Sequence, residues 1–335
     1  MKKRQEYELG GIILYDNNYK PIASEIDKSR APYIKSNDFT GLRNSEFKYF
    51  ILNEGDFQKR NQFVSITKLR NLLRNIEYNK LIISGWDLLE FWFLLLSNPK
   101  SKNCLALEST IYESKVKGLK GLIKKIFLSN ISTVFVSGNL HVKLLKALNY
   151  IDTIKITKGV GIINKPKITI KGKTYKRKFL YVGRISRVKN LEILIEVFNN
   201  LPDYQLSLIG NGSDIEYLKK KSYENINFLG AIDNKKLKTH FQKNDIFILP
   251  SISEPWGLVV EEALYFGLPV IVSKHCGSSE LIINGINGYL INPNNYDDII
   301  NTILKVDDII YNDLLDGVRK FSINKKDKIQ VNTYV

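Results

Sequence analysis

The clearest pattern in the chain is an alternation of short apolar runs, most of them ending in glycine or proline, with longer stretches of helical apolar spacing. It predicts parallel strands joined by helices, because strands that are buried on both faces are apolar throughout. The predicted strands lie at residues 179–183, 205–210, 226–230, 245–250 and 269–272, and the predicted helices at 191–199, 215–221, 235–242 and 257–266. This order is typical of a doubly wound α/β sheet, in which ligands bind at the carboxyl ends of the strands.

The first half of the chain shows the same alternation less regularly, and the opening forty residues fit neither pattern. Predicted strands lie at 48–52, 81–84, 104–107 and 133–137, and predicted helices at 65–75, 87–97 and 139–148. Residues 159–173 are rich in glycine, lysine and proline and predict a linker. We therefore expect two Rossmann-like domains, at 1–165 and 166–335, with the active site in the cleft between them. The last helix is a candidate to cross back to the first domain.

Residues 253–264 carry the most informative chemistry. Pro255 is tolerated in the first turn of a helix and Gly257 allows close backbone approach, so a helix is expected to begin here with its free N–H groups directed at the cleft. Such a helix end binds phosphate or sugar oxygens. Glu254 lies in the loop before the helix, whereas Glu262 lies inside it, where a carboxylate can accept both hydroxyls of a ribose. Glu261 is expected to face solvent. The simpler alternative makes Glu254 an N-terminal charge and Glu262 a surface position.

This segment resembles the Glu-x7-Glu signature of the retaining glycosyltransferases of the large GT-B family usually called family 4. Upstream, residues 181–190 look like the Gly-Arg…Lys-Asn segment of that family, which implies that Arg184 and Lys189 bind the donor diphosphate. Residues 210–212 resemble its Gly-x-Gly turn, and residues 228–232 its strand at the nucleobase pocket. Residues 267–271 and 285–291 match its remaining segments, so the resemblance covers residues 179–293.

The resemblance implies a GT-B fold and a retaining transfer of sugar from a nucleotide-diphosphate sugar to a glycan or lipid-linked acceptor. Bacterial surface polysaccharide synthesis, such as lipopolysaccharide, O-antigen or capsule, is the expected setting. In this reading Arg184 and Lys189 stabilise the leaving diphosphate, Glu254 orients the donor sugar and Glu262 holds the ribose. The other residues expected to contact the donor are Gly183, Gly210, Asn211, Gly212, Ile232, Trp256, Gly257, Leu258 and Val259.

No metal or other cofactor is expected. The planar guanidinium of Arg184, the mobile ammonium of Lys189 and the helix end can together neutralise a diphosphate without Mg²⁺. The three histidines, His141, His240 and His275, are scattered along the chain and show no spacing typical of a metal site.

The acceptor side departs from the family pattern, in which a histidine of the first domain and a Gly-Gly loop near the chain start line the cleft. Neither is convincingly present, and Gly10-Gly11 is the one candidate for the loop. Glu108 directly follows the strand predicted at 104–107, so we expect it at the acceptor side, with a purely structural role as the alternative.

The net charge of +16 is concentrated in residues 100–178, which contain 18 basic and 3 acidic residues. Within this region, residues 115–127 predict a basic amphipathic helix, which favours docking on an anionic membrane surface. The helix combines Lys115, Lys117, Lys120, Lys124 and Lys125 with Leu119, Leu122, Ile123, Ile126 and Phe127. A solvated helix covering the core of the first domain is the alternative. A nucleic-acid-binding protein is a second reading of the charge, and a nucleotide-sugar epimerase a second reading of the fold, but no recognised nucleic-acid-binding module is present.

The cysteine content and the apolar stretches of the chain are typical of a cytoplasmic enzyme. Cys104 and Cys276 lie far apart and predict neither a disulfide nor a metal site. The most apolar stretch, residues 81–99, contains Asp87 and Glu90, and no signal core follows the charged start of the chain. We therefore expect a cytoplasmic protein, peripheral on the inner face of the cell membrane.

Overall fold

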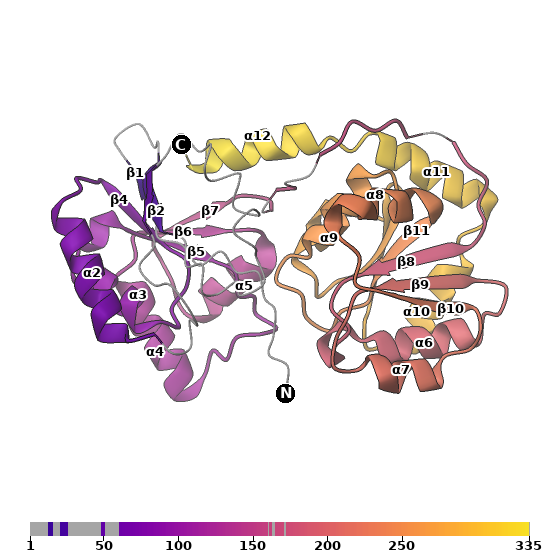
Figure 1. Cartoon of the computed structure of the whole chain (residues 1–335), viewed down its shortest axis with the longest axis horizontal. Coiled ribbons are helices and arrows are strands. Elements are labelled where there is room, and N and C mark those ends of the chain that lie inside the picture. The colour runs from indigo at the N-terminus through magenta and orange to yellow at the C-terminus, as the bar shows by residue number, and fades with distance from the viewer. Residues whose placement is uncertain are drawn as a thin grey trace.

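The computed structural model describes residues 13–15, 21–25, 48–50, 60–159, 161–162, 165–170 and 172–334. The chain forms two α/β domains that lie side by side, each built on one sheet flanked by helices (Figure 1). The predicted α/β class with two Rossmann-like domains is therefore confirmed. Gly10, Gly11 and most of the opening forty residues lie outside the described residues.

The sheet of the second domain is entirely parallel in the described part of the chain, with the order β10-β9-β8-β11-β12-β13. Its strands are β8 (Lys178–Val182), β9 (Gln205–Ile209), β10 (Ile226–Gly230), β11 (Ile246–Leu249), β12 (Val270–Ser273) and β13 (Gly288–Ile291). The helices are α6 (Leu191–Asn199), α7 (Ile215–Lys221), α8 (Asn234–Lys243), α9 (Leu258–Tyr265), α10 (Tyr296–Leu304) and α11 (Asp308–Arg319). All elements predicted between 179 and 272 are confirmed. The strand order reverses between β8 and β11, where doubly wound folds bind ligands.

The sheet of the first domain has the order β3-β2-β1-β4-β5-β6-β7 within the described residues. Its strands are β1 (Ile13–Tyr15), β2 (Pro21–Glu25), β3 (Lys48–Phe50), β4 (Lys80–Ile83), β5 (Asn103–Leu107), β6 (Thr133–Val136) and β7 (Thr153–Ile156). The helices are α2 (Gln62–Arg74), α3 (Leu89–Leu96), α4 (Gly118–Ser129) and α5 (Asn139–Ala147). β4 to β7 are parallel, whereas β1 runs antiparallel to both of its neighbours. β1, β2 and β7 were not predicted.

Each domain has a core of its own. Phe179, Leu180 and Tyr181 of the central strand β8 are fully buried in one core, and Leu81 and Ile83 of β4 in the other. Both faces of these strands are covered by helices, which is why their sequences are continuously apolar.

Two segments connect the domains, namely the stretch between β7 and β8 and the final helix α12 (Ile323–Tyr334). In Figure 1, α12 runs from the second domain across to the first, where the chain ends. The Thr333 hydroxyl donates to the carbonyl of Ile156 in β7 at 3.4 Å, and the Tyr334 ring stacks on Phe135 with centroids 4.6 Å apart. The last helix thus packs against the edge of the first sheet.

Candidate functional site

Two glycine-lined loops meet at the carboxyl ends of β8 and β9. A Cβ atom on Gly210 would lie 1.8 Å from the carbonyl oxygen of Gly183, and one on Gly212 would lie 1.8 Å from that of Ile185. The amide of Ile185 donates to the carbonyl of Asn211 at 2.9 Å. Only glycine therefore fits at positions 210 and 212. Because residues 210–212 pack directly against the backbone of Gly183 and Ile185, they shape the loop that carries Arg184.

The loop after β8 is held from inside the domain. The hydroxyl of Tyr181, which is fully buried, donates to the carbonyl of Arg184 at 2.8 Å. After a short 3-10 turn at Arg187–Lys189, Asn190 adopts left-handed backbone and its amide donates to the carbonyls of Pro250 and Pro293, at 3.3 and 2.6 Å. The loops after β8 and β11 are consequently fixed to each other.

Glu254 and Lys189 form an ion pair across these two loops, and both side chains are mostly buried. Burial raises the pKa of the Tyr181 hydroxyl well above its usual value, and the charge of Glu254 raises it further, whereas Arg184 opposes the shift. Arg184 and Glu254 thus both act on the Tyr181 hydroxyl, and together with Lys189, the ion-pair partner of Glu254, they make up the charge cluster of this site.

The N-terminus of α9 is shaped by a second close approach. Gly257 has φ of 87°, and a Cβ atom there would lie 2.7 Å from the sulfur of Cys276. The amide of Ser278 donates to the carbonyl of Trp256 at 2.7 Å, and that of Gly277 to the carbonyl of Glu254 at 3.0 Å. Burial, with Glu254 adding to it, raises the pKa of the Cys276 thiol to about 12, so this cysteine packs as a neutral group.

Glu262 lies in the second turn of α9 and is 7% exposed. Its pKa is raised chiefly by burial, a shift that the side chain of Asn234 opposes and the charge of Glu261 increases. The Asn234 amide donates to Glu262 Oε1 at 3.5 Å. Asn234 begins α8, two residues after the half-buried Ile232, so Glu262 faces the loop that follows β10. Asn234 was not predicted, because a lone asparagine at a helix start normally indicates only a cap.

Glu261 does not face solvent, and this prediction is wrong. Its side chain is 0% exposed, its carboxylate lies 2.8 Å from Lys326 Nζ in α12, and it accepts a hydrogen bond from the indole N–H of Trp256. The side chain of Trp256 is itself buried. The expectation failed because α12, which returns from the end of the chain, covers this side of α9.

In the loop predicted for the acceptor side, Glu113 contacts the second domain. The Glu108 side chain is exposed, and its backbone carbonyl lies 3.0 Å from Nε2 of His141. Glu113 Oε1 instead accepts a hydrogen bond from the hydroxyl of Ser253 at 2.7 Å, next to Glu254. Glu108 and Glu113 lie in the same loop, and the role predicted for Glu108 stays a prediction.

Two further contacts join the domains around this loop. Tyr112 stacks on His275 with ring centroids 4.0 Å apart, and the backbone amide of Asn139 donates to the carboxylate of Glu280. His141 is fully buried in α5, and this burial lowers its pKa to about 4, so it is a neutral packing residue. None of Tyr112, Glu113 and Glu280 belongs to a local pattern that sequence reasoning detects.

The described residues include no group of three or more His, Cys, Asp or Glu side chains that could hold a metal ion. Across the same residues, no helix combines the length and apolar character that a membrane span requires. Cys104 and Cys276 are both buried free thiols.

Residues 164–308 match the family model described as "Glycosyl transferases group 1". A protein of the cps region of Klebsiella pneumoniae is 31% identical over 163 residues, which are 48% of this chain and 45% of that protein. The O-antigen biosynthesis glycosyltransferase WbnH of Escherichia coli is 29% identical over 245 residues, 71% of this chain and 70% of that protein. The chain thus spans about half the length of the Klebsiella relative and more of WbnH.

Solved structures share the fold at low sequence identity. Sucrose-phosphate synthase from Thermosynechococcus elongatus aligns with a TM-score of 0.70 at 20% identity, covering 85% of this chain and 81% of that chain. The lipopolysaccharide outer core galactosyltransferase WaaB aligns with a TM-score of 0.65 at 18% identity, covering 88% and 85%. HepE from Anabaena in complex with UDP aligns with a TM-score of 0.63 at 16% identity, covering 86% and 85%. The fold is the GT-B arrangement of two facing domains.

Proposed function

We propose that this protein, whose residues 164–308 belong to the glycosyl transferases group 1 family, transfers a sugar from a nucleotide-diphosphate sugar to a glycan or lipid-linked acceptor. The observation that carries the proposal is the charge cluster of Arg184, Lys189 and Glu254 at the switch point of the second sheet. The structure of HepE with UDP in the same fold supports a nucleotide donor.

The leaving diphosphate would be bound by Arg184, Lys189 and the first N–H groups of α9. Arginine offers a planar fork to phosphate oxygens and lysine a compact charge. The backbone at Leu258 and Val259 adds N–H donors and the positive end of the helix dipole. These groups are held in place before the reaction, and preorganised charge stabilises a leaving group without a metal ion.

Glu262 would accept the hydroxyls of the ribose, and Glu254 would orient the donor sugar. Glu262 is buried beside Asn234, at the edge where the base and ribose of a nucleotide are expected. Glu254 is ion-paired with Lys189, so the carboxylate proposed to orient the sugar and the ammonium proposed to bind the diphosphate are held together. The acceptor hydroxyl would then attack on the face from which the diphosphate leaves, with retention of the anomeric configuration.

The names of the relatives support bacterial surface polysaccharide as the product. One is named for O-antigen biosynthesis, and another lies in a cps region. WaaB is named for the lipopolysaccharide outer core. These names describe glycosyltransferases and a protein of a cps region rather than epimerases or nucleic-acid-binding proteins.

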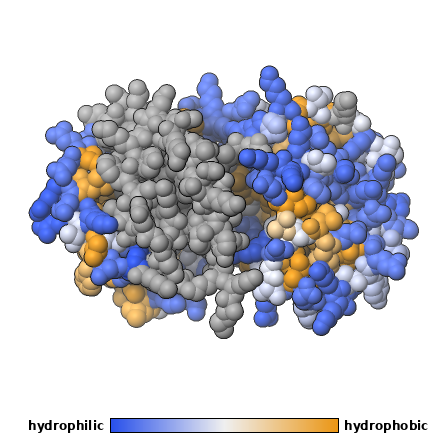
Figure 2. Space-filling model, viewed as in Figure 1, coloured by the Kyte–Doolittle hydropathy of each residue, from blue (hydrophilic) through white to orange (hydrophobic). Residues whose placement is uncertain are grey.

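Helix α4 supports docking on an anionic membrane surface, which would place the protein peripherally on the inner face of the cell membrane. Leu119, Leu122, Ile123 and Ile126 share one side of α4 and are 43% to 73% exposed. Figure 2 shows apolar surface at the lower left of the molecule, where α4 lies in Figure 1. The predicted helix 115–127 needs correction, because α4 begins at Gly118, Lys115 and Lys117 precede it, and Phe127 is buried against Trp92.

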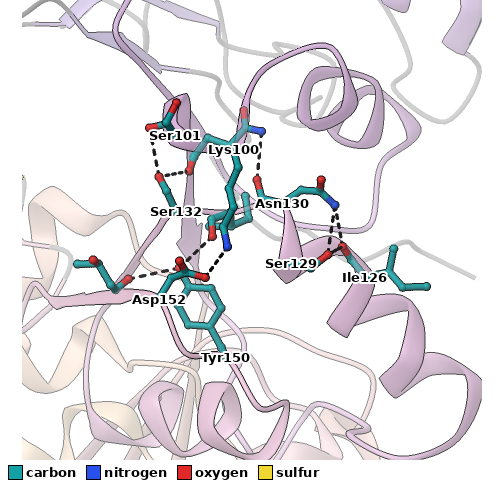
Figure 3. A network of polar contacts seen from close by, with 11 residues as sticks. Lys100, Ser101, Ile126, Ser129, Asn130, Ser132, Tyr150 and Asp152 are labelled. Atoms are coloured by element: carbon teal, nitrogen blue, oxygen red, sulfur yellow. Dashed lines mark hydrogen bonds and ion pairs between the residues drawn. The ribbon is translucent and has the colours of Figure 1, made fainter.

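The far end of α4 is fixed to the first sheet. The Asn130 amide donates to the carbonyl of Ile126 at 3.0 Å, and the Asn130 carbonyl accepts from the Asn103 amide at 3.1 Å. At the same end of the sheet, the Ser132 hydroxyl donates to the carbonyl of Ser101, and Lys100 and Asp152 form an ion pair of 2.7 Å (Figure 3). A helix held in this way would transmit its orientation on a membrane to the whole domain.

The proposed activity is tested by incubating the protein with UDP, GDP, TDP and ADP sugars and a lipid-linked or glycan acceptor. A matching donor at one hundred times its dissociation constant should stabilise the fold by about 2.7 kcal/mol, which thermal unfolding detects. The product should keep the anomeric configuration of the donor, as read by NMR. The absence of both stabilisation and turnover with every donor would refute the proposed function. An inverted anomer would refute retention.

A further inference from the structure

A buried ion pair joins the last helix of the chain to the helix of the candidate site. Lys326 of α12 is 6% exposed, and its ammonium lies 2.8 Å from the carboxylate of Glu261 in α9, which is 0% exposed. Asp327 lies 3.5 Å from the same ammonium and is ion-paired with Lys165 of the segment between the domains. Replacing a buried ion pair by apolar groups is often neutral or stabilising, so stability alone does not account for its presence.

The pair is in direct contact with the loop that carries Glu254. Glu261 accepts a hydrogen bond from the indole N–H of Trp256, and Trp256 lies two residues after Glu254. The indole is buried, and its hydrogen bond to this carboxylate restricts the rotation of the ring. Lys326 therefore acts on Glu254 through two intermediate side chains.

The segment between the domains passes directly beside the Glu261–Lys326 pair. Gly159 has φ of 124°, and a Cβ atom there would lie 2.3 Å from Glu261 Oε1 and 2.8 Å from Lys326 Nζ. The other end of α12 is bonded to β7 through Thr333 and Ile156. Both segments that connect the domains thus meet at the Glu261–Lys326 pair. This pair therefore links the arrangement of the domains to the loop that carries Glu254.

We propose that Lys326 and Glu261 are positioning residues for the transfer reaction, because together they hold Trp256 and thereby set the placement of Glu254 opposite the first domain. The inference rests on the proposed function. Neither residue is expected to touch the donor. Loss of the pair should therefore lower kcat and leave nucleotide affinity unchanged.

The test compares Lys326→Met, Trp256→Phe and the combined variant, with Lys325→Met as the matched control. Lys325 is the exposed neighbour of Lys326 in the same helix. Trp256→Phe keeps an aromatic ring and removes the N–H that donates to Glu261, together with part of the buried ring volume. We expect kcat to fall about tenfold in Lys326→Met and in Trp256→Phe, with nucleotide affinity in Lys326→Met within about twofold of the original protein. The combined variant should be no slower than Lys326→Met alone, because the residues act in series.

A second measurement does not depend on activity. The chain contains three tryptophans, so protein labelled with 5-fluorotryptophan should give three ¹⁹F resonances, and Trp256→Phe identifies the one from Trp256. This resonance should move in Lys326→Met and stay in place in Lys325→Met. Identical spectra and equal kcat in these two variants would overturn the inference. If Lys326→Met does not fold, unchanged kcat in Trp256→Phe overturns it instead.

The two proposals fail in distinguishable ways. If the original protein turns over no nucleotide sugar, the proposed function fails, and the catalytic part of this inference fails with it. If the original protein is active and kcat is the same in all variants, the positioning role fails while the proposed function stands.

Discussion

The carboxylate of Glu254 is ion-paired with the ammonium of Lys189, 65 residues away in the sequence, and both side chains are mostly buried. The pair ties the loop before α9 to the loop after β8. A diphosphate that binds Lys189 must compete with this carboxylate or bind beside it. Glu254 is therefore expected to influence both the sugar and the charge that its neighbour offers to the leaving group.

Replacement of Glu254 by Gln should separate turnover from nucleotide binding. We expect kcat to fall roughly 10- to 100-fold, because the sugar loses an orienting group. Affinity for the free nucleoside diphosphate should stay the same or increase, because Lys189 no longer faces a carboxylate. Calorimetric titration and initial rates measure the two quantities. Glu192→Gln, in an exposed ion pair with Lys221, serves as the control. A variant with normal turnover would remove Glu254 from the mechanism.

Arg184→Ala and Glu262→Ala should each weaken binding of the nucleoside diphosphate. The loss of one charged hydrogen-bonding partner costs about 1.5–3 kcal/mol, which corresponds to roughly 10- to 150-fold in affinity. Arg187→Ala is the matched control, since Arg187 lies in the same loop with an exposed side chain. Calorimetry should find the control unchanged. Normal affinity in both site variants would show that the nucleotide binds elsewhere.

Glu262→Gln should make the protein more stable at neutral and higher pH while it weakens nucleotide binding. Burial raises the pKa of Glu262, so stability falls as the pH rises from the usual pKa of a glutamate to the raised one, and the full cost is present above the raised value. The cost is absent at low pH, where the carboxyl group is protonated in both the folded and the unfolded chain. We expect a gain of about 0.5–2 kcal/mol at about pH 8 that shrinks towards about pH 4.

Thermal unfolding at both pH values measures this gain. Glu216→Gln, at an exposed position, should change neither melting temperature. An equal or lower melting temperature of Glu262→Gln at about pH 8 would contradict the expected cost of the buried carboxylate.

Transfer should continue in the presence of EDTA. Arg184, Lys189 and the start of α9 supply the positive charge that a metal ion would otherwise bring to the diphosphate. The measurement is the initial rate with and without EDTA, followed by addition of Mg²⁺ or Mn²⁺. Loss of activity that either ion restores would refute the metal-free scheme.

The second domain could be predicted almost completely from the sequence because its strands are buried on both faces. Strands β8 to β12 are short apolar runs with turn residues at their ends, and the charges of the site lie beside those turns. Strand β13 was missed because its four residues, two of them only half-buried, give a weak signal. Helices α10 and α11 follow the last recognised segment and were not predicted individually.

Contacts between the domains could not be predicted. Glu113 and Ser253 are 140 residues apart, and Asn139 and Glu280 are 141 residues apart. Glu261 was expected in solvent because helical periodicity shows which positions share a face but not what covers that face. No local pattern pointed to Glu113 either, because its contact with Ser253 joins the two domains.

Binding to an anionic membrane should depend on the exposed side of α4. Lys120 is exposed and Lys125 is half-buried, whereas Lys124 already donates to the Ser114 hydroxyl and the Lys115 carbonyl and lies over the Trp86 ring. Lys124 therefore contributes to the local structure, and a test that includes it would confuse unfolding with loss of docking. Each lysine near an anionic surface contributes about 1 kcal/mol at modest salt, so reversing the charges of Lys120 and Lys125 should lower affinity at least about tenfold.

The test uses Lys120→Glu with Lys125→Glu, and separately Leu119→Ser with Leu122→Ser, in sedimentation with liposomes. The original protein should bind phosphatidylglycerol liposomes, and high salt should release it. It should not bind phosphatidylcholine liposomes. Both double variants should lose binding, because docking needs the charge and the apolar stripe together. Lys219→Glu with Lys220→Glu, in α7 of the other domain, makes the same charge change elsewhere and should bind normally. Equal binding by all three double variants would show that α4 is not the docking surface.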